Sequence, residues 1–214
     1  MSAAILFKRF LARPLRVAYI FPSTQFLVRR VVSKCDYSQA RIIVELGPGE
    51  GVHTREILRR MTPDSRLFLI ELDPVLADHV RGQFAHDPRV EVITADASKI
   101  REELTKRGIE YCDYVISGIP FSMFDVPTKL RILNAVHASL APNAHSAFIV
   151  YQCTHELKQH ATMFPRVRSE YCLLNLPPIF VTVYQKQALN GHKQEAGCPH
   201  CKAAAQPSGV NGVG

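Results

Sequence analysis

Three acidic residues lie at or beside the ends of apolar runs, and a glycine-rich stretch follows the first of them. Residues 42–54 read IIVELGPGEGVHT and contain Glu45, Glu71 lies near the end of RLFLIEL, and Asp96 follows VEVITA. If each run is a buried strand, these carboxylates meet at the edge of a sheet where open α/β folds bind ligands. A carboxylate accepts two hydrogen bonds at once, so Glu71 suits ribose hydroxyls and Asp96 suits an exocyclic amine. The pattern therefore predicts a nucleoside site.

The glycines at positions 47, 49 and 51 form the pattern G-x-G-x-G between a strand and a helix. Glycine lets the backbone approach a ligand closely and adopt positive φ. The pattern fits neither the G-x-G-x-x-G dinucleotide fingerprint nor a P-loop, because no Gly-Lys-Ser/Thr follows. The acidic surroundings favour a nucleoside whose remaining part is positively charged. Taken alone, the loop is also compatible with an ordinary turn between a strand and a helix.

Apolar runs alternate with helical patterns through the middle of the chain, which predicts an α/β fold. Unbroken apolar strands that alternate with helices are typical of a parallel sheet covered on both faces. The turn Asn-Leu-Pro-Pro at 175–178 predicts that the last two strands form an antiparallel hairpin. Strands are expected at 41–47, 66–72, 90–95, 114–118, 146–152, 169–174 and 179–186, and helices at 52–61, 74–85, 98–107, 126–140 and 154–163.

The two ends of the chain differ in composition from this domain, which we place at residues 35–186. Residues 1–34 hold seven Lys or Arg and no Asp or Glu, which accounts for the net charge of +7. They predict basic amphipathic helices at 1–12 and 23–34, the second capped by Ser23. Such a segment suits an anionic membrane surface or a nucleic acid. Residues 187–214 predict a disordered tail.

The sequence shows no signal peptide and no apolar stretch long enough to span a bilayer, so we expect a cytoplasmic location. Cys198-Pro-His-Cys201 lacks the second pair of ligands that a zinc site usually has, and we expect no metal. Asp73 precedes Pro74 and has two possible roles, ligand binding and helix capping. His53 follows the glycine loop, where it either relays a proton or is a helix residue without a chemical role.

Four motifs together resemble those of class I S-adenosylmethionine-dependent methyltransferases: ELGPGEG (45–51), IELDP (70–74), TADA (94–97) and SGIPF (117–121). The resemblance covers roughly residues 40–186. It implies a Rossmann-like seven-stranded sheet with a reversed last strand, and S-adenosylmethionine as the cofactor. The cofactor-binding residues that it implies are Glu45, Gly47, Gly49, Gly51, Glu71, Leu72, Asp96, Ala97 and Ser117.

The fourth motif bears on the methyl acceptor. Enzymes that methylate the exocyclic amine of adenine carry Asn or Asp, an apolar residue, Pro, and Tyr or Phe, but here Gly118 stands in the first place. Glycine has no side chain to accept a hydrogen bond from the amine. Residues 13–24 and 164–184 instead resemble bacterial phospholipid N-methyltransferases, whose amphipathic N-terminal region docks on an anionic bilayer.

We therefore expect an N-methyltransferase of an amine-bearing lipid headgroup, such as phosphatidylethanolamine or ornithine lipid, that associates peripherally with the inner membrane surface through residues 1–34. No stable nucleic-acid partner is expected. Aromatic faces attract cations, so Tyr19, Phe121 and Tyr151 are candidates to surround the ammonium. The alternatives are an rRNA adenine N6-methyltransferase and a cofactor-binding protein without transfer activity. The candidate catalytic residues are Tyr19, Ser117, Gly118, Ile119, Pro120, Phe121 and Tyr151.

Overall fold

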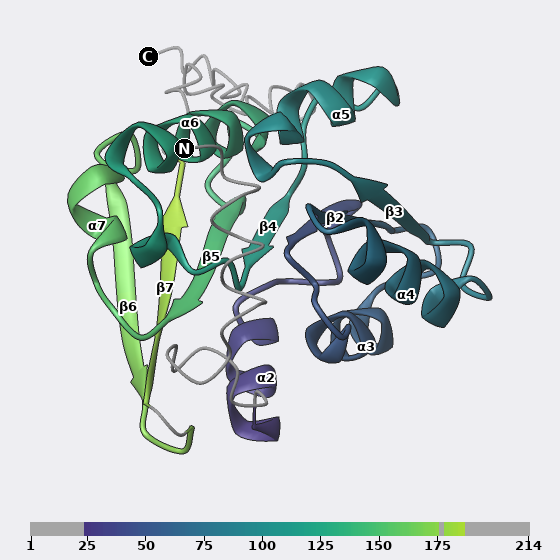
Figure 1. The fold of residues 1–214 in the computed structure, drawn as a ribbon, viewed down its shortest axis with the longest axis horizontal. Coiled ribbons are helices and arrows are strands. Elements are labelled where there is room, and N and C mark those ends of the chain that lie inside the picture. Colours follow the sequence, from purple (N-terminus) through teal and green to yellow (C-terminus); the bar gives the residue numbers. More distant parts are fainter. Residues whose placement is uncertain (1–23, 176–177, 187–214) are drawn as a thin grey trace, which may run out of the picture.

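The computed structural model describes residues 24–175 and 178–186, and these form a single seven-stranded sheet in the order β3-β2-β1-β4-β5-β7-β6 (Figure 1). The first five strands are parallel, and β7 pairs antiparallel with both β5 and β6. The predicted parallel sheet with a reversed last strand is confirmed. The strands are β1 Ile42–Leu46, β2 Arg66–Glu71, β3 Val90–Thr94, β4 Tyr114–Ser117, β5 Ala147–Gln152, β6 Arg166–Cys172 and β7 Ile179–Gln185.

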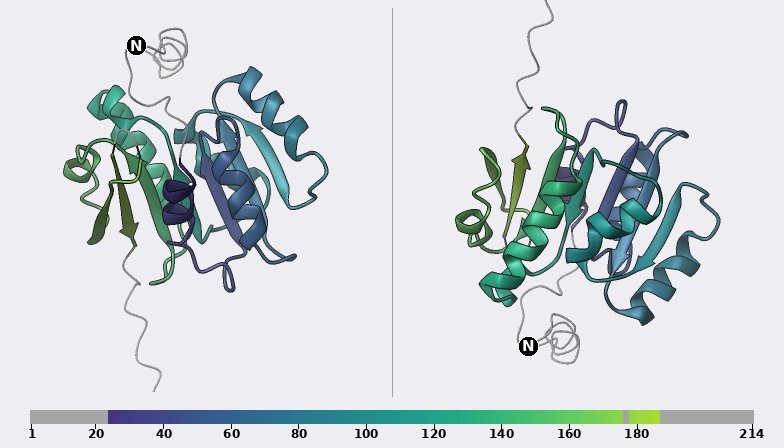
Figure 2. Two further views of the ribbon diagram at one scale, coloured as in Figure 1. Left: turned by 90° about the horizontal axis from the view of Figure 1, so that it is seen from below. Right: turned by 90° about the horizontal axis from the view of Figure 1, so that it is seen from above.

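Helices cover both faces of the sheet, as the two views of Figure 2 show. Successive strand residues point to opposite faces, so β1 sends Ile43 into one core and Val44 into the other. The Ile43 core contains side chains of α2 Gln25–Val32, α3 Val52–Arg60 and α4 Pro74–Phe84. The Val44 core contains side chains of α5 Ile100–Lys106, α6 Val126–Ser139 and α7 Leu157–His160. The two short 3₁₀ turns are η2 Ala97–Lys99 and η3 Phe121–Met123.

Helix α2 is part of the folded domain. Its N-cap is Thr24 and not the predicted Ser23, because the Thr24 hydroxyl accepts a hydrogen bond from the amide of Leu27 at 3.2 Å. The Thr24 amide donates to Asn175 Oδ1 at 3.1 Å, which joins the start of α2 to the loop after β6. Glu170 on β6 forms ion pairs with Arg30 and Lys34, so two charges of the basic segment are paired within the domain.

Several element boundaries differ from the sequence expectation. Strand β6 begins at Arg166 instead of 169, because its residues pair with β7 in unbroken register back to Gln185. Helix α7 spans only Leu157–His160 of the expected 154–163. The expected helix at 1–12 and the tail at 187–214 lie outside the described residues. Within the described ranges, no helix combines the length and the apolar character that a bilayer crossing requires.

The glycine loop predicts a difference between two glycine-to-alanine changes. Gly51 has φ +74°, and an added Cβ would lie 2.7 Å from the Phe84 ring. We expect Gly51→Ala to lower the free energy of unfolding by about 1–3 kcal/mol, through backbone strain and overpacking. The matched change Gly82→Ala lies on α4 with open space around it, and we expect it to raise stability by up to about 1 kcal/mol. Urea unfolding measures both, and equal stabilities would contradict this view of the loop.

Candidate functional site

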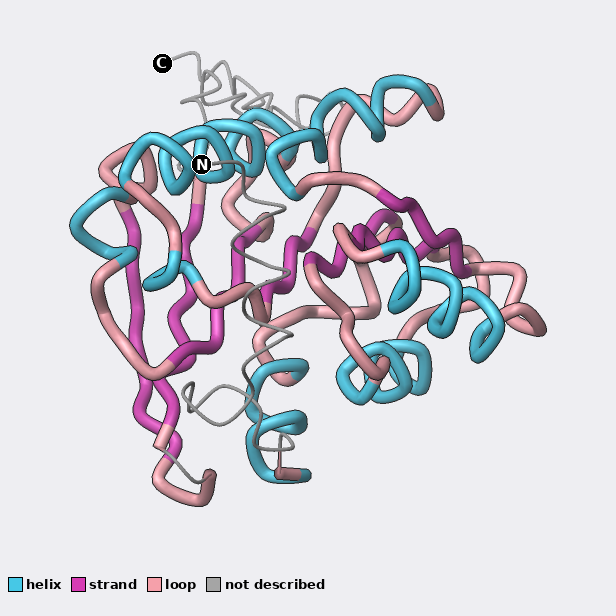
Figure 3. The backbone as a smooth tube through the Cα atoms, in the orientation of Figure 1, coloured by secondary structure: helices cyan, strands magenta, loops and turns pink. Residues whose placement is uncertain are grey.

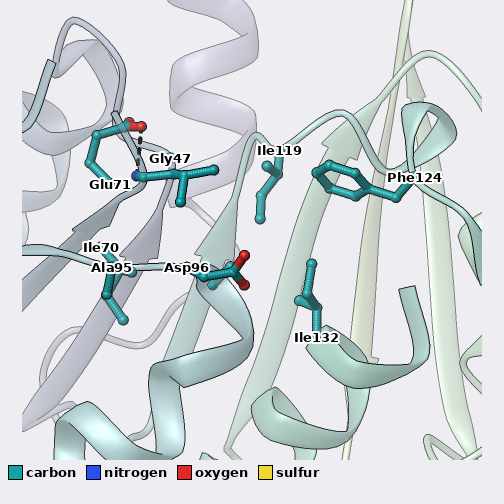
Figure 4. A pocket seen from close by; sticks show the side chains of 10 residues that line it. Gly47, Ile70, Glu71, Ala95, Asp96, Ile119, Phe124 and Ile132 are labelled. Atoms are coloured by element: carbon teal, nitrogen blue, oxygen red, sulfur yellow. Dashed lines mark hydrogen bonds between the residues drawn. The ribbon is translucent and has the colours of Figure 1, made fainter. Parts of the chain in front are cut away.

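A hollow of about 370 Å³ lies at the carboxyl ends of β1, β2, β3 and β4. The loops that line it each connect a strand to the helix after it (Figure 3). Figure 4 shows the acidic residues Glu71 and Asp96 together with the apolar side chains of Ile119, Phe124 and Ile132. Hollows that combine an apolar lining with a few polar groups are typical sites for small molecules. The lining residues are Gly47, Ile70, Glu71, Leu72, Ala95, Asp96, Ala97, Ile119, Phe124 and Ile132.

Glu71 ends β2 at the floor of the hollow and is only 1% exposed. One carboxylate oxygen accepts from the amides of Leu72 at 2.9 Å and Asp73 at 3.1 Å, and the other accepts from Gly49 at 3.4 Å. Burial raises the pKa of this carboxyl, and the backbone donors oppose that rise. Glu71 therefore fixes the glycine loop against β2 and places a carboxyl group beside the hollow.

Asp96 follows β3 and lies on the same hollow. Its Oδ1 accepts from the amide of Ser98 at 2.8 Å and so caps η2, which fixes the side chain beside Ala97. The neighbouring acid Asp73 also caps a helix, since its carboxylate accepts from the amides of Val75 and Leu76 at the start of α4. The two acids differ in that Asp96 lines the hollow and Asp73 does not.

Glu45 lies behind the glycine loop and is 1% exposed. Its Oε2 accepts from the Thr54 hydroxyl at 2.6 Å, while Oε1 has no partner among the described residues. Burial raises the pKa of Glu45 to about 7, and the nearby charge of Glu71 acts in the same direction. No basic side chain is among the described residues lining the hollow. Glu45 itself does not line the hollow, and its unpartnered oxygen adds an uncompensated acid behind it, which favours a ligand that carries positive charge.

The three loop glycines have different surroundings. Gly47 lines the hollow with φ +68°, and the nearest atom to an added Cβ is Ile119 Cγ2 at 4.0 Å. Gly49 donates to Glu71, as described above. Gly51 instead packs against Phe84 of α4, so the contact that requires glycine there is made with the protein's own core.

The motif after β4 divides between the hollow and the core. Ile119 lines the hollow, whereas Ser117 is 0% exposed and its hydroxyl accepts from the Ile119 amide at 3.3 Å. Pro120 precedes η3, and its carbonyl accepts from the Met123 amide.

Phe121 does not face the hollow as we expected. It is 0% exposed and packs edge-to-face on Phe148, because η3 turns its ring into the core. Phe124 supplies the aromatic lining in its place. The only sequence signal that could have indicated Phe124 is that a second phenylalanine follows Phe121 by three residues.

Tyr151, near the end of β5, contacts a residue that the sequence left open. Its ring stacks on His53 of α3 with centroids 4.3 Å apart, and its hydroxyl lies 3.2 Å from His53 Nδ1. Burial lowers the pKa of His53 to about 4 and raises the pKa of the Tyr151 phenol. His53 is therefore neutral near pH 7, and neither it nor Tyr151 is among the residues that line the hollow. The remaining predicted aromatic, Tyr19, lies outside the described residues.

Comparison with known proteins gives three sequence findings. Residues 19–167 match the profile of the family described as ribosomal RNA adenine dimethylase. The chain is 32% identical over 162 residues to an ornithine lipid N-methyltransferase from Singulisphaera acidiphila, covering 76% of this chain and 84% of that protein. It is 29% identical over 150 residues to a ribosomal RNA small subunit methyltransferase A from Chlorobium phaeobacteroides, covering 69% of this chain but 49% of that protein.

Solved structures support the fold. A precorrin-6y C5,15-methyltransferase from Geobacter metallireducens superimposes with a TM-score of 0.59, covering 78% of this chain and 92% of its own, at 15% sequence identity. At this identity the likeness concerns the arrangement of the sheet and helices.

Glu71 provides the direct test of the hollow as a binding site. We expect Glu71→Gln to weaken binding of S-adenosylmethionine by roughly 10- to 100-fold, because a hydrogen bond to a charged group is worth about 1.5–3 kcal/mol. The control Glu102→Gln removes a carboxylate of α5 that pairs with Lys99 and Lys106 at the surface, and it should leave affinity unchanged. Isothermal calorimetry measures both, and equal affinities in folded proteins would refute the assignment.

Proposed function

The chain belongs to the ribosomal RNA adenine dimethylase family and is an S-adenosylmethionine-dependent methyltransferase, and we propose that its methyl acceptor is the amine of a lipid headgroup. Membership of a methyltransferase family sets aside the alternative of a binding protein without transfer activity. The proposal concerns the acceptor, and one feature of the surface carries it.

Six exposed apolar side chains belong to elements that begin or end at the edge of the sheet where the hollow is formed. Val75 is 75% exposed and lies in the first turn of α4, three residues after Leu72 of the hollow. Val126 begins α6, two residues after Phe124. We call this set the apolar rim: Phe26, Val75, Val126, Leu130, Leu173 and Leu174.

The β6–β7 connection contributes two adjacent exposed leucines to the rim. Strand β6 runs parallel to β5, because β7 is antiparallel to both, so the carboxyl end of β6 lies at the same edge as the hollow. Leu173 and Leu174 follow that end and are 70% and 65% exposed. The Thr24 hydroxyl donates to the Leu174 carbonyl, which joins the start of α2 to this end of β6 (Figure 1), and Phe26 is the second residue of α2.

A membrane surface accounts for the rim better than RNA does. Soluble proteins seldom expose large apolar patches, and such patches mark sites of contact with a partner or a membrane. RNA binding depends on Lys and Arg that neutralise phosphates, whereas the charged side chains of the hollow are Glu71 and Asp96. The sequence similarity to a protein named as an ornithine lipid N-methyltransferase supports the same acceptor class.

Residues of the hollow bind the cofactor, and residues of the apolar rim contact the membrane. When bound, S-adenosylmethionine supplies the methyl group for transfer. In this proposal Glu71 and Asp96, which line the hollow, hold its sugar and base, and Gly47 leaves room for it beside β1. The apolar wall of Ile119 and Phe124 limits water in the hollow. The rim lets the protein rest on a bilayer, so that a headgroup amine reaches the site from the membrane.

An rRNA adenine N6-methyltransferase is the second candidate, and the family match favours it. Against it, Gly118 provides no side chain to accept from the adenine amine. The two candidates therefore differ in whether the acceptor is a lipid or a nucleobase.

Transfer of a labelled methyl group separates these acceptors. We expect label in the lipid of vesicles that contain phosphatidylethanolamine or ornithine lipid in an anionic background, with no label in small-subunit rRNA. Mass spectrometry of the lipid identifies an added mass of methyl on the headgroup nitrogen. Label confined to RNA would overturn the lipid proposal and support the second candidate.

The rim is tested in the same assay. We expect Leu173→Ser combined with Leu174→Ser to reduce vesicle binding and methylation of vesicle lipid by at least about tenfold, because two buried leucines are each worth roughly 1.5–3 kcal/mol. Methylation of a short-chain, water-soluble analogue should be unchanged. The matched control Tyr111→Ser alters an apolar residue that is 38% exposed and precedes β4, at the opposite edge. Equal losses in both variants would argue against docking through the rim.

A further inference from the structure

Gly118 and Tyr151 are matched to each other across the ends of two neighbouring strands. An added Cβ at Gly118 would lie 2.6 Å from Tyr151 Cζ and closer still to its hydroxyl oxygen. Gly118 follows β4, Tyr151 lies near the end of β5, and the two strands pair in parallel. The tyrosine therefore fills the space that any side chain at position 118 would need.

His53 fixes the tyrosine in this place. The stacked rings and the 3.2 Å contact between Tyr151 Oη and His53 Nδ1 hold the phenol over Gly118. His53 is 4% exposed, and its Nε2 has no partner among the described residues. When the neutral imidazole carries its proton on Nε2, Nδ1 accepts the hydrogen bond of the Tyr151 hydroxyl, and the proton stays on the phenol. The oxygen of Tyr151 then keeps its lone pairs for an incoming donor.

We propose that Tyr151 determines the acceptor specificity of this enzyme, with its hydroxyl as the hydrogen-bond acceptor for the headgroup amine and His53 as its positioning residue. This inference rests on the proposed function, because it names the group that receives the lipid amine. Gly118 has no side chain, and the Tyr151 hydroxyl fills the adjacent space from the neighbouring strand β5.

The arrangement suits an alkyl amine better than a planar base. A side chain at position 118 would extend from the end of β4 beside Ile119, which lines the hollow. Tyr151 instead presents a ring and a hydroxyl from β5, and an aromatic face attracts a cationic headgroup. Its position also leaves little room above Gly118. The same tyrosine thus accepts an amine and narrows the space that a flat base would occupy.

The activity test uses changes that keep the shape of the site. We expect Tyr151→Phe, which keeps the ring and removes the hydroxyl, to lower kcat/KM for vesicle aminolipid by 10- to 100-fold. Binding of S-adenosylmethionine should change less than twofold. His53→Leu should give a similar loss, and His53→Asn should restore part of it, since its Oδ1 can replace Nδ1 as the acceptor. His53→Leu should add nothing further in the Tyr151→Phe protein. Unchanged kcat/KM in Tyr151→Phe would overturn the proposal.

A stability cycle tests the matched pair without any acceptor. We expect Gly118→Ala to lower the urea midpoint in the wild-type background and to have little effect in the Tyr151→Ala background. An equal shift in both backgrounds would refute the pairing. Failure of the proposed function is a separate result, because the wild-type protein would then transfer no methyl to vesicle lipid. In that case the cycle still decides whether Tyr151 fills position 118, and transfer to RNA by wild-type protein would overturn the specificity role.

Discussion

Two carboxyl groups buried without a basic partner are the constraint on which the site depends. Glu45 and Glu71 are each 1% exposed and form no ion pair among the described residues. Burying a carboxylate is costly unless a cation or hydrogen-bond donors compensate it. The Thr54 hydroxyl and the amides around Glu71 supply part of that compensation. A positively charged ligand can supply the remaining compensation. The strand ends and the glycine loop form the hollow that would hold such a ligand.

The second half of the site is the membrane side. Helix α2 is fastened to β6 by the pairing of Glu170 with Arg30 and Lys34, and to the β6–β7 connection by Thr24. These contacts join the start of α2, which carries the exposed Phe26, to the exposed leucines after β6. A cation site and an apolar rim at one edge form a suitable arrangement for an enzyme that takes a charged cofactor from water and an amine from a bilayer.

The sequence predicted the features that depend on local pattern. Apolar runs placed each strand within three residues, and the carboxylates after those runs line or adjoin the hollow because parallel strands bring their ends together. Features that depend on contacts between distant segments were not predictable. The glycine at 51 is explained by Phe84, the glycine at 118 by Tyr151, and the choice of Phe124 over Phe121 by the rotation of η3. His53 could be placed at a helix start, but its stacking on a β5 tyrosine could not be foreseen.

The central claim is tested most directly by proton release during binding of S-adenosylmethionine. Burial raises the pKa of Glu45 to about 7, so the free protein holds a large share of protons on this group at pH 6.5. A cationic ligand favours the ionised form and expels them. Calorimetry in buffers of different ionisation enthalpy should show that the wild-type protein releases more protons per ligand bound than Glu45→Gln. Equal release by the two proteins would contradict the account.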